Sequence, residues 1–318
     1  MRNKNRTLMK PEERIVTFPI IGKESSDTLR EFFESLDLKV QTPPPTTDKT
    51  VRLGVAHSPD MMCFPYKVTL GNLVEAIDAG ANTLIMYDSQ GQCRFRQYNK
   101  LHEFTLRQLG HDFEMYPITL KSLVPVMSRV SGKSWLEVFK KVAPRFKSIV
   151  KDDERSWSED KPNIGIIGEI YCCVDEVVNS GLEDQIRALD ANPYNTSKVP
   201  AFLWESLRSA LHVKDTHPFN RKLAGYKREA REYFNGPLGG HSFENLYNLL
   251  ELTDRGIDGV VHVLPLSCMP ESTIEPYINQ ICSDKGIPLL RIPIDENNSA
   301  ANLATRLETF VELIKWKK

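Results

Sequence analysis

One pattern, a helix, a glycine-ended turn, an apolar strand and then a cysteine, occurs twice in this chain. In the first half Leu73–Tyr87 leads to Cys93, and in the second half Leu249–Val263 leads to Cys268. Each helix closes on Asp-x-Gly, where glycine suits the left-handed conformation of a helix C-cap. The repeat predicts two similar α/β domains that face each other across a cleft, with the carboxyl ends of both sheets at one interior site.

Apolar, β-branched runs alternate with helix-period segments along both halves, which is the pattern of βαβ units. In the first half we expect strands at Ile15–Ile21, Leu38–Gln41, Val51–His57, Thr83–Tyr87 and Phe113–Tyr116. Helices are expected between them at Ser26–Ser35, Tyr66–Ala79 and Phe95–Leu109. In the second half we expect strands at Asn163–Ile170, Gly259–Leu264 and Pro288–Ile292, and helices at Glu244–Asp254, Glu271–Ser283 and Ala300–Lys315.

The predicted fold class is α/β, with two flavodoxin-like parallel-sheet domains, a helical bridge and a cluster site in the cleft between the domains. We place an N-terminal tail at 1–13, the first domain at 14–119, the bridge at 120–161 and the second domain at 162–318. Residues 190–235 are assigned only loosely to helices and loops. The bridge carries an apolar stripe at helical spacing, interpreted as core packing: Leu123, Val126, Val130, Leu136, Phe139, Val142 and Phe146.

Composition narrows the class of protein. A chain of 318 residues is long enough for two ordinary domains, and its net charge of −1 gives no reason to expect nucleic acid or an anionic membrane as a partner. No run of 18 apolar residues exists, so no transmembrane helix is expected. The basic N-terminus lacks an apolar segment, and six cysteines without a secretory signal belong in a reducing compartment. We therefore expect a cytoplasmic protein.

Three cysteines, Cys63, Cys93 and Cys268, each follow a strand-like run, so we expect them at one rim. The alternative is three unrelated core cysteines, because free cysteine is among the most buried residues. Thiolates suit zinc, Cu(I) or iron–sulfur clusters. Intervals of 30 and 175 residues without a close histidine disfavour a structural zinc site. Three thiolates on a cubane would leave one iron open, as a reactive cluster needs.

The remaining cysteines have separate expectations. Cys172 and Cys173 follow a predicted strand, and one of the two is a candidate fourth ligand because adjacent side chains point in different directions. Cys282 lies on the apolar side of a predicted helix with Ile278 and is assigned to the core.

Three other residues are candidate catalytic groups. Glu271 directly follows Cys-Met-Pro and could cap a helix or move a proton. Glu169 ends a predicted strand, where an unpaired buried carboxylate would be costly. His241 could begin a helix or face the cleft, whereas His57 and His262 are interpreted as core histidines on strands.

At these residues the chain resembles the 2-hydroxyacyl-CoA dehydratase component family, which includes 2-hydroxyglutaryl-CoA dehydratase, benzoyl-CoA reductase subunits and double-cubane cluster proteins. The resemblance is closest to the branch associated with CoA-enzyme activases. The most specific matching segment ends in Cys-Met-Pro-Glu. The matching segments are Val16–Pro19, Ser58–Lys67, Gly91–Phe95, Gly168–Tyr171, Asp258–Glu271 and Thr305–Phe310.

This resemblance implies that Cys63, Cys93 and Cys268 ligate an oxygen-sensitive [4Fe–4S] cluster, or alternatively a double-cubane [8Fe–9S] cluster. It implies electrons from a dimeric activator ATPase that carries its own iron–sulfur cluster. Further implied partners are a homologous subunit or a second copy of this chain, and a small-molecule or acyl-CoA substrate. Arg94 and Arg96 are candidates for the docking surface or for an anionic substrate, with ordinary solvated charge as the alternative.

The chain also departs from the family pattern. The usual Gly-Pro-Cys-Arg-Phe-Gly reads Gly91–Arg96 with glutamine and arginine in place of proline and glycine, and the common Thr-Gly-Glu-Ala-Gly is replaced at Asn297–Asn302. Because all three cysteines are retained, we expect these changes to affect the substrate pocket more than the binding of the cluster. Three functions remain open: an iron–sulfur oxidoreductase or lyase driven by an activator, a subunit of a 2-hydroxyacyl-CoA dehydratase, and a non-catalytic electron-relay or scaffold subunit.

Overall fold

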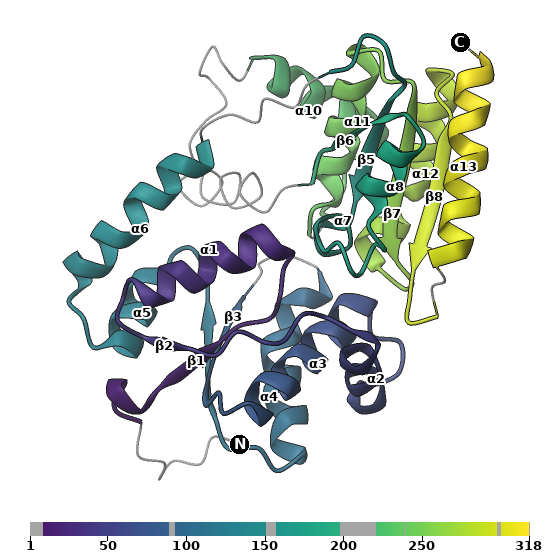
Figure 1. Ribbon diagram of the computed structural model, residues 1–318. Coiled ribbons are helices and arrows are strands. Elements are labelled where there is room, and N and C mark those ends of the chain that lie inside the picture. Colours follow the sequence, from purple (N-terminus) through teal and green to yellow (C-terminus); the bar gives the residue numbers. More distant parts are fainter. Residues whose placement is uncertain are drawn as a thin grey trace.

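The computed structural model describes the backbone of residues 9–88, 93–150, 157–197, 221–238, 240–297 and 300–317, and the side chains of these residues except 143–150 and 221. The loosely assigned stretch therefore falls partly outside the described residues, as do the tail before residue 9 and the side chain of Phe146. Within the described residues the chain forms two four-stranded, all-parallel sheets in two lobes (Figure 1). The predicted α/β class with two parallel sheets is confirmed.

The first sheet has the strand order β2-β1-β3-β4. Helices α1, α5 and α6 cover one face, and α3 and α4 cover the other, with α2 packed on α3. The strands are β1 (Ile15–Thr17), β2 (Lys39–Val40), β3 (Thr83–Tyr87) and β4 (Glu114–Ile118). The helical elements are η1 (Pro11–Glu13), α1 (Lys23–Glu34), α2 (Asp48–His57), α3 (Phe64–Asp78), η2 (Arg94–Gln97), α4 (Tyr98–Gln108), α5 (Leu123–Ser131) and α6 (Trp135–Val150).

The second sheet has the corresponding order β6-β5-β7-β8. Helices α10, α11 and α12 cover one face, and α7, α8 and α13 cover the other (Figure 1). The strands are β5 (Asn163–Gly168), β6 (Asn192–Asn195), β7 (Gly259–Pro265) and β8 (Leu289–Ile294). The helices are α7 (Ile170–Val174), α8 (Leu182–Ala188), α10 (Arg221–Tyr233), α11 (Ser242–Asp254), α12 (Met269–Asp284) and α13 (Ala300–Lys317).

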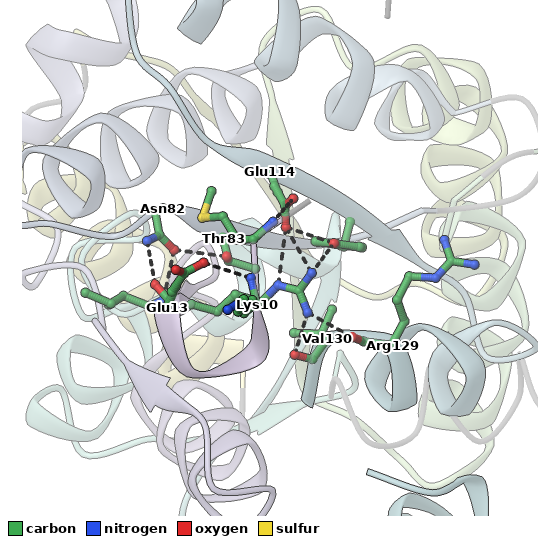
Figure 2. Close-up of polar contacts among 11 residues, drawn as sticks. Lys10, Glu13, Asn82, Thr83, Glu114, Arg129 and Val130 are labelled. Atoms are coloured by element: carbon green, nitrogen blue, oxygen red, sulfur yellow. Dashed lines mark hydrogen bonds and ion pairs between the residues drawn. The ribbon is translucent and has the colours of Figure 1, made fainter. Parts of the chain in front are cut away.

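The two halves repeat each other down to single hydrogen bonds. Helices α3 and α11 both end in a glycine with positive φ, 104° at Gly80 and 79° at Gly256. In each lobe the residue two positions after this glycine then accepts a hydrogen bond from the neighbouring strand of the sheet. Asn82 Oδ1 accepts from the first backbone N–H of β1 at 2.8 Å, and Asp258 Oδ2 accepts from the first N–H of β5 at 2.7 Å. Asn82 also bonds Glu13 and Thr83 beside it (Figure 2). The internal repeat is therefore present in three dimensions.

The segment Val51–His57, predicted as a strand, is helical and belongs to α2. Its start is set by Thr47 at the N-cap, whose hydroxyl accepts from the N–H of Thr50, while the Thr50 hydroxyl accepts from the N–H of Thr47. A short apolar run does not by itself distinguish a strand from a buried helix. His57 consequently lies in the last turn of a helix, not on a strand, and Cys63 follows a helix.

Strand β6 was not predicted, because Asn-Pro-Tyr-Asn offers no apolar run and a proline argues against a strand. It pairs with β5 at the edge of the sheet, where a proline is tolerated. The stripe of the bridge is core only in part. Val130 and Val142 are buried, but Leu136 is 61% and Phe139 is 47% exposed. The charged run after α6 lies outside the described residues.

The two lobes share packing. Phe64 and Val68 of α3 lie in the core that α7, α8 and α13 form on the second sheet. The Lys67 ammonium lies 2.5 Å from a Glu296 carboxylate oxygen in the loop after β8. The N–H of Gly22 donates to Asp175 at 3.4 Å. Helix α3 therefore belongs to both lobes. No helix among the described residues is both long and apolar enough to cross a membrane.

Candidate functional site

Cys63 is the N-cap residue of α3, and Pro65 occupies the second position of that helix. The thiol is buried, with 7% of the residue exposed. The loop that carries it contains Met61, whose φ is 61°. The Arg94 guanidinium donates to the Met61 carbonyl at 2.5 Å. Arg94 therefore holds the Cys63 loop, while Arg96 is exposed to solvent.

Cys93 and Cys268 occupy equivalent places in the two lobes. Cys93 follows β3 and is the N-cap residue of η2, and Cys268 follows β7 and is the N-cap residue of α12. In each sheet this is the central strand pair where the strand order reverses, which is where open α/β sheets bind ligands. Backbone N–H groups at a helix start favour a thiolate, and the N–H groups of Phe95 and Glu271 lower the pKa of Cys93 and of Cys268 respectively, against the larger effect of burial.

Cys93 reaches across to the second lobe. A Cβ placed on Gly240, in the loop before α11, would lie 3.7 Å from the Cys93 sulfur and 3.9 Å from Pro270 in the first turn of α12. The thiols also affect each other. Burial raises the pKa of Cys93 to about 11, and the charge of Cys63 contributes to this rise. Burial also raises the pKa of Cys268, with a contribution from the same charge. The charge of Cys63 therefore acts on both Cys93 and Cys268.

Burial raises the pKa of Cys63 as well, although the Tyr98 hydroxyl and the Arg94 charge oppose the rise. The Tyr98 oxygen lies 2.6 Å from the Cys63 sulfur, and only 2% of Tyr98 is exposed. Thiols with raised pKa values stay protonated at neutral pH unless a cation replaces the proton. Burial therefore argues against a free nucleophilic thiolate at any of the three cysteines.

Glu271 is buried, with 1% exposed, and accepts hydrogen bonds from side chains on two other elements. Ser242 Oγ donates at 2.7 Å, Asn245 Nδ2 lies 3.0 and 3.2 Å from the two carboxylate oxygens, and His262 Nε2 lies 2.8 Å away. Asn245 also bonds the N–H and the carbonyl of Gly168 at the end of β5. This network fixes the start of α12, and thus Cys268, against β5, β7 and α11.

Glu169 and His241 both stand at helix starts. Glu169 is the N-cap residue of α7 and accepts the N–H of Cys172 at 3.0 Å. Removal from water raises the pKa of Glu169 to about 7, although the backbone N–H groups of Cys172 and Tyr171 oppose this rise. The negative charge of Glu271 adds to the rise. His241 is the N-cap residue of α11, and its Nδ1 lies 3.9 Å from a Glu244 oxygen.

The other cysteines are core residues in this structure. Cys172 and Cys173 lie in α7 with 0% and 2% exposed, and they pack into the apolar core of the second lobe. Burial raises the pKa of Cys172, with a small contribution from the charge of Cys268. Cys282 packs with Ile278 under α11.

The donor set decides which group these residues fit. The described residues contain no group of three or more His, Cys, Asp or Glu side chains that could hold a metal ion. A single metal ion needs all of its ligands around one point. In an iron–sulfur cluster each thiolate binds a different iron, so the ligand sulfurs need not meet at one point. Cys63, Cys93 and Cys268 offer soft donors, helix N-termini and burial, so they fit a cluster better than a single ion.

The fold and the site define a two-lobed parallel α/β protein with cysteines at the carboxyl ends of its central strands. Two family comparisons match. The family described as 2-hydroxyglutaryl-CoA dehydratase, D-component, matches residues 113–314, and the CoA enzyme activase uncharacterised domain matches residues 23–87. The chain belongs to the 2-hydroxyglutaryl-CoA dehydratase D-component family, as its resemblance indicated. Cys93 lies between the two matched stretches. A search of curated proteins found no match.

Sequence reasoning did not single out three residues of this site: Tyr98, Gly240 and Asn245. Tyr98 follows Cys93 by five positions, but nothing in that spacing indicates a contact with Cys63 from another helix. Gly240 belongs to a glycine-rich loop that has no nucleotide-binding motif. Asn245 reads as an ordinary polar residue in a helix. Each acquires its place only through tertiary packing.

Proposed function

We propose that this chain is an iron–sulfur component of a 2-hydroxyacyl-CoA dehydratase-type system, in which Cys63, Cys93 and Cys268 hold a [4Fe–4S] cluster. The observation that supports this most is the approach of Cys93, from the first lobe, to Gly240 and Pro270 beside Cys268 in the second. This approach supports a shared site for the strand-end cysteines of the two lobes. Membership of the dehydratase family supports the same conclusion.

When bound, such a cluster supplies one-electron chemistry at a low potential and an iron that is open to a further ligand. The chain itself contributes burial that excludes water, N–H groups that favour thiolates, and the Glu271 network that holds α12. We propose that a dimeric activator ATPase provides the electrons, and the activase-type match supports this. The raised pKa of Glu169, about 7, supports a role for this carboxyl in holding or releasing a proton near neutral pH.

The ligand assignment is tested by iron and sulfide analysis of anaerobically purified variants. Cys63→Ala, Cys93→Ala and Cys268→Ala should each lose most of the bound iron. Cys282→Ala is the matched control, because Cys282 is a buried thiol in the same lobe as Cys268. It should retain the iron. Normal iron content in all three variants would contradict the proposal, and loss in Cys172→Ala or Cys173→Ala would add a fourth ligand.

The electron donor is tested by following cluster reduction anaerobically with and without the cognate activator and ATP. Reduction should require both components, because the low-potential cluster lies beyond the reach of ordinary donors. The Arg96→Gly variant removes the exposed charge beside Cys93. Slower cluster reduction in this variant than in the wild type would indicate that the charge belongs to the docking surface. Equally fast reduction without ATP would instead leave a simple electron-relay subunit.

A further inference from the structure

Tyr98 is held rigidly against the Cys63 sulfur. Its ring meets the rings of Tyr66, Phe95 and His102 edge-on, with centroid separations of 5.1, 5.0 and 5.7 Å and interplanar angles of 82°, 82° and 74°. Tyr98 is also the first residue of α4, directly after η2, which Cys93 caps. Its hydroxyl therefore cannot swing away from Cys63 without moving the segment that positions Cys93.

The direction of the hydrogen bond follows from the chemistry of the two groups. A thiol is a weak donor, whereas a phenol hydroxyl is a good donor and a thiolate accepts it well. A phenol ordinarily titrates at about pH 10, so Tyr98 carries its proton at neutral pH. Tyr98 is the donor and the Cys63 sulfur is the acceptor.

The three thiols differ in what donates to them. Cys93 and Cys268 cap η2 and α12, so the donors nearest to them in the chain are backbone N–H groups, which a side-chain substitution leaves in place. Cys63 differs because a side-chain hydroxyl, that of Tyr98, lies 2.6 Å from its sulfur. Hydrogen bonds to ligating sulfurs are among the features that set the reduction potential of an iron–sulfur cluster. A donor stabilises the reduced state more, because that state carries more negative charge.

We propose that Tyr98 is a positioning residue that donates a hydrogen bond to the Cys63 sulfur while this sulfur ligates the cluster, and that it thereby raises the reduction potential of the cluster. The inference rests on the proposed function. Its consequence is that Tyr98 lowers the demand on the one-electron donor, because a less negative potential is easier to reach.

The test is a redox titration of the purified holoprotein with a low-potential one-electron reductant, followed by EPR. Loss of the Tyr98 hydrogen bond in Tyr98→Phe should make the reduction equilibrium on the order of tenfold less favourable, a shift of about 59 mV to more negative potential. Tyr66→Phe is the control. The Tyr66 hydroxyl lies 3.4 Å from Thr105 Oγ1 and not against a proposed ligand, while the Tyr66 ring packs edge-on against the Tyr98 ring.

Iron content separates the possible outcomes. An iron-loaded Tyr98→Phe with the wild-type potential would overturn the role of Tyr98 and leave the proposed function intact. An iron-free wild type would overturn both. If Tyr98→Phe folds poorly, 3-fluorotyrosine at position 98 provides a second variant of nearly the same shape. Being the stronger donor, it should shift the potential in the positive direction, and an unchanged potential would overturn the proposal.

Discussion

At the scale of single residues, the aromatic side chains near Cys63 form one buried group that includes His102. Its ring stacks on Tyr66 at 4.4 Å and an angle of 9°, and its Nε2 lies 3.3 Å from the Tyr66 carbonyl. Complete burial lowers the pKa of His102 to about 3. The sequence assigned no role to this residue, because a lone histidine in an amphipathic helix carries no signal of its neighbours.

This buried histidine makes folding sensitive to acid. The folded state keeps His102 neutral, whereas the unfolded chain binds a proton below its ordinary pKa of about 6.5. Its contribution to stability is therefore fully present above about pH 6.5 and is lost as the pH falls towards about 3, by about 1.4 kcal/mol per pH unit. Urea unfolding between about pH 7 and pH 4 should show this slope in the wild type and a shallower slope in His102→Gln. The same dependence of unfolding free energy on pH in the wild type and in His102→Gln would show that His102 is not the group responsible.

At the scale of elements, the sequence predicted those helices and strands whose signals are local. Strand Thr83–Tyr87 was predicted with its observed ends, because an apolar run follows a glycine C-cap. Helix α2 was mistaken for a strand because its character comes from contact with α3. A Cβ on Gly54 would lie 1.7 Å from the Lys67 carbonyl oxygen, and one on Gly71 would lie 2.0 Å from that of Thr50. Such backbone contact between helices is invisible in a hydrophobic pattern.

The crossing of α2 and α3 positions Cys63, which lies in the connection between them. Gly54→Ala should destabilise the protein by roughly 1–3 kcal/mol or more, because the added methyl meets rigid backbone. It should also lower iron loading by displacing the Cys63 loop. The matched control is Gly225→Ala in α10, where nothing lies within 4 Å of the new methyl. There alanine should be neutral or stabilise by about 0.5–1 kcal/mol. Equal urea midpoints for Gly54→Ala and the wild type would contradict this packing.

At the scale of the whole molecule, the two lobes act as one unit through α3. The internal repeat predicted two α/β lobes with related ends, but it could not show that a helix of the first lobe would supply core residues to the second. Phe64 directly follows Cys63 and is 6% exposed among residues of the second lobe. The placement of one proposed ligand therefore depends on packing between the lobes.

Truncation of Phe64 should affect both lobes together. Phe64→Ala should cost roughly 3–5 kcal/mol, because it removes a buried ring from a core that both lobes share. Phe104→Ala is the control, since Phe104 lies on α4 with 63% of its surface exposed, and the change should stay within about 0.5 kcal/mol. Urea titrations followed by fluorescence and by circular dichroism measure the free energy of unfolding of both variants. A loss for Phe64→Ala as small as that for Phe104→Ala would show that the lobes do not share this core.

The most direct test of the central claim is anomalous diffraction at the iron edge from crystals grown without oxygen. The account predicts one group of iron peaks bonded to the sulfurs of Cys63, Cys93 and Cys268, with Fe–S distances of about 2.3 Å, close to the value for zinc. The peak heights and sulfide content would distinguish a cubane from a double cubane. Iron bound elsewhere in the chain, or three protonated thiols with no metal between them in active protein, would contradict the account.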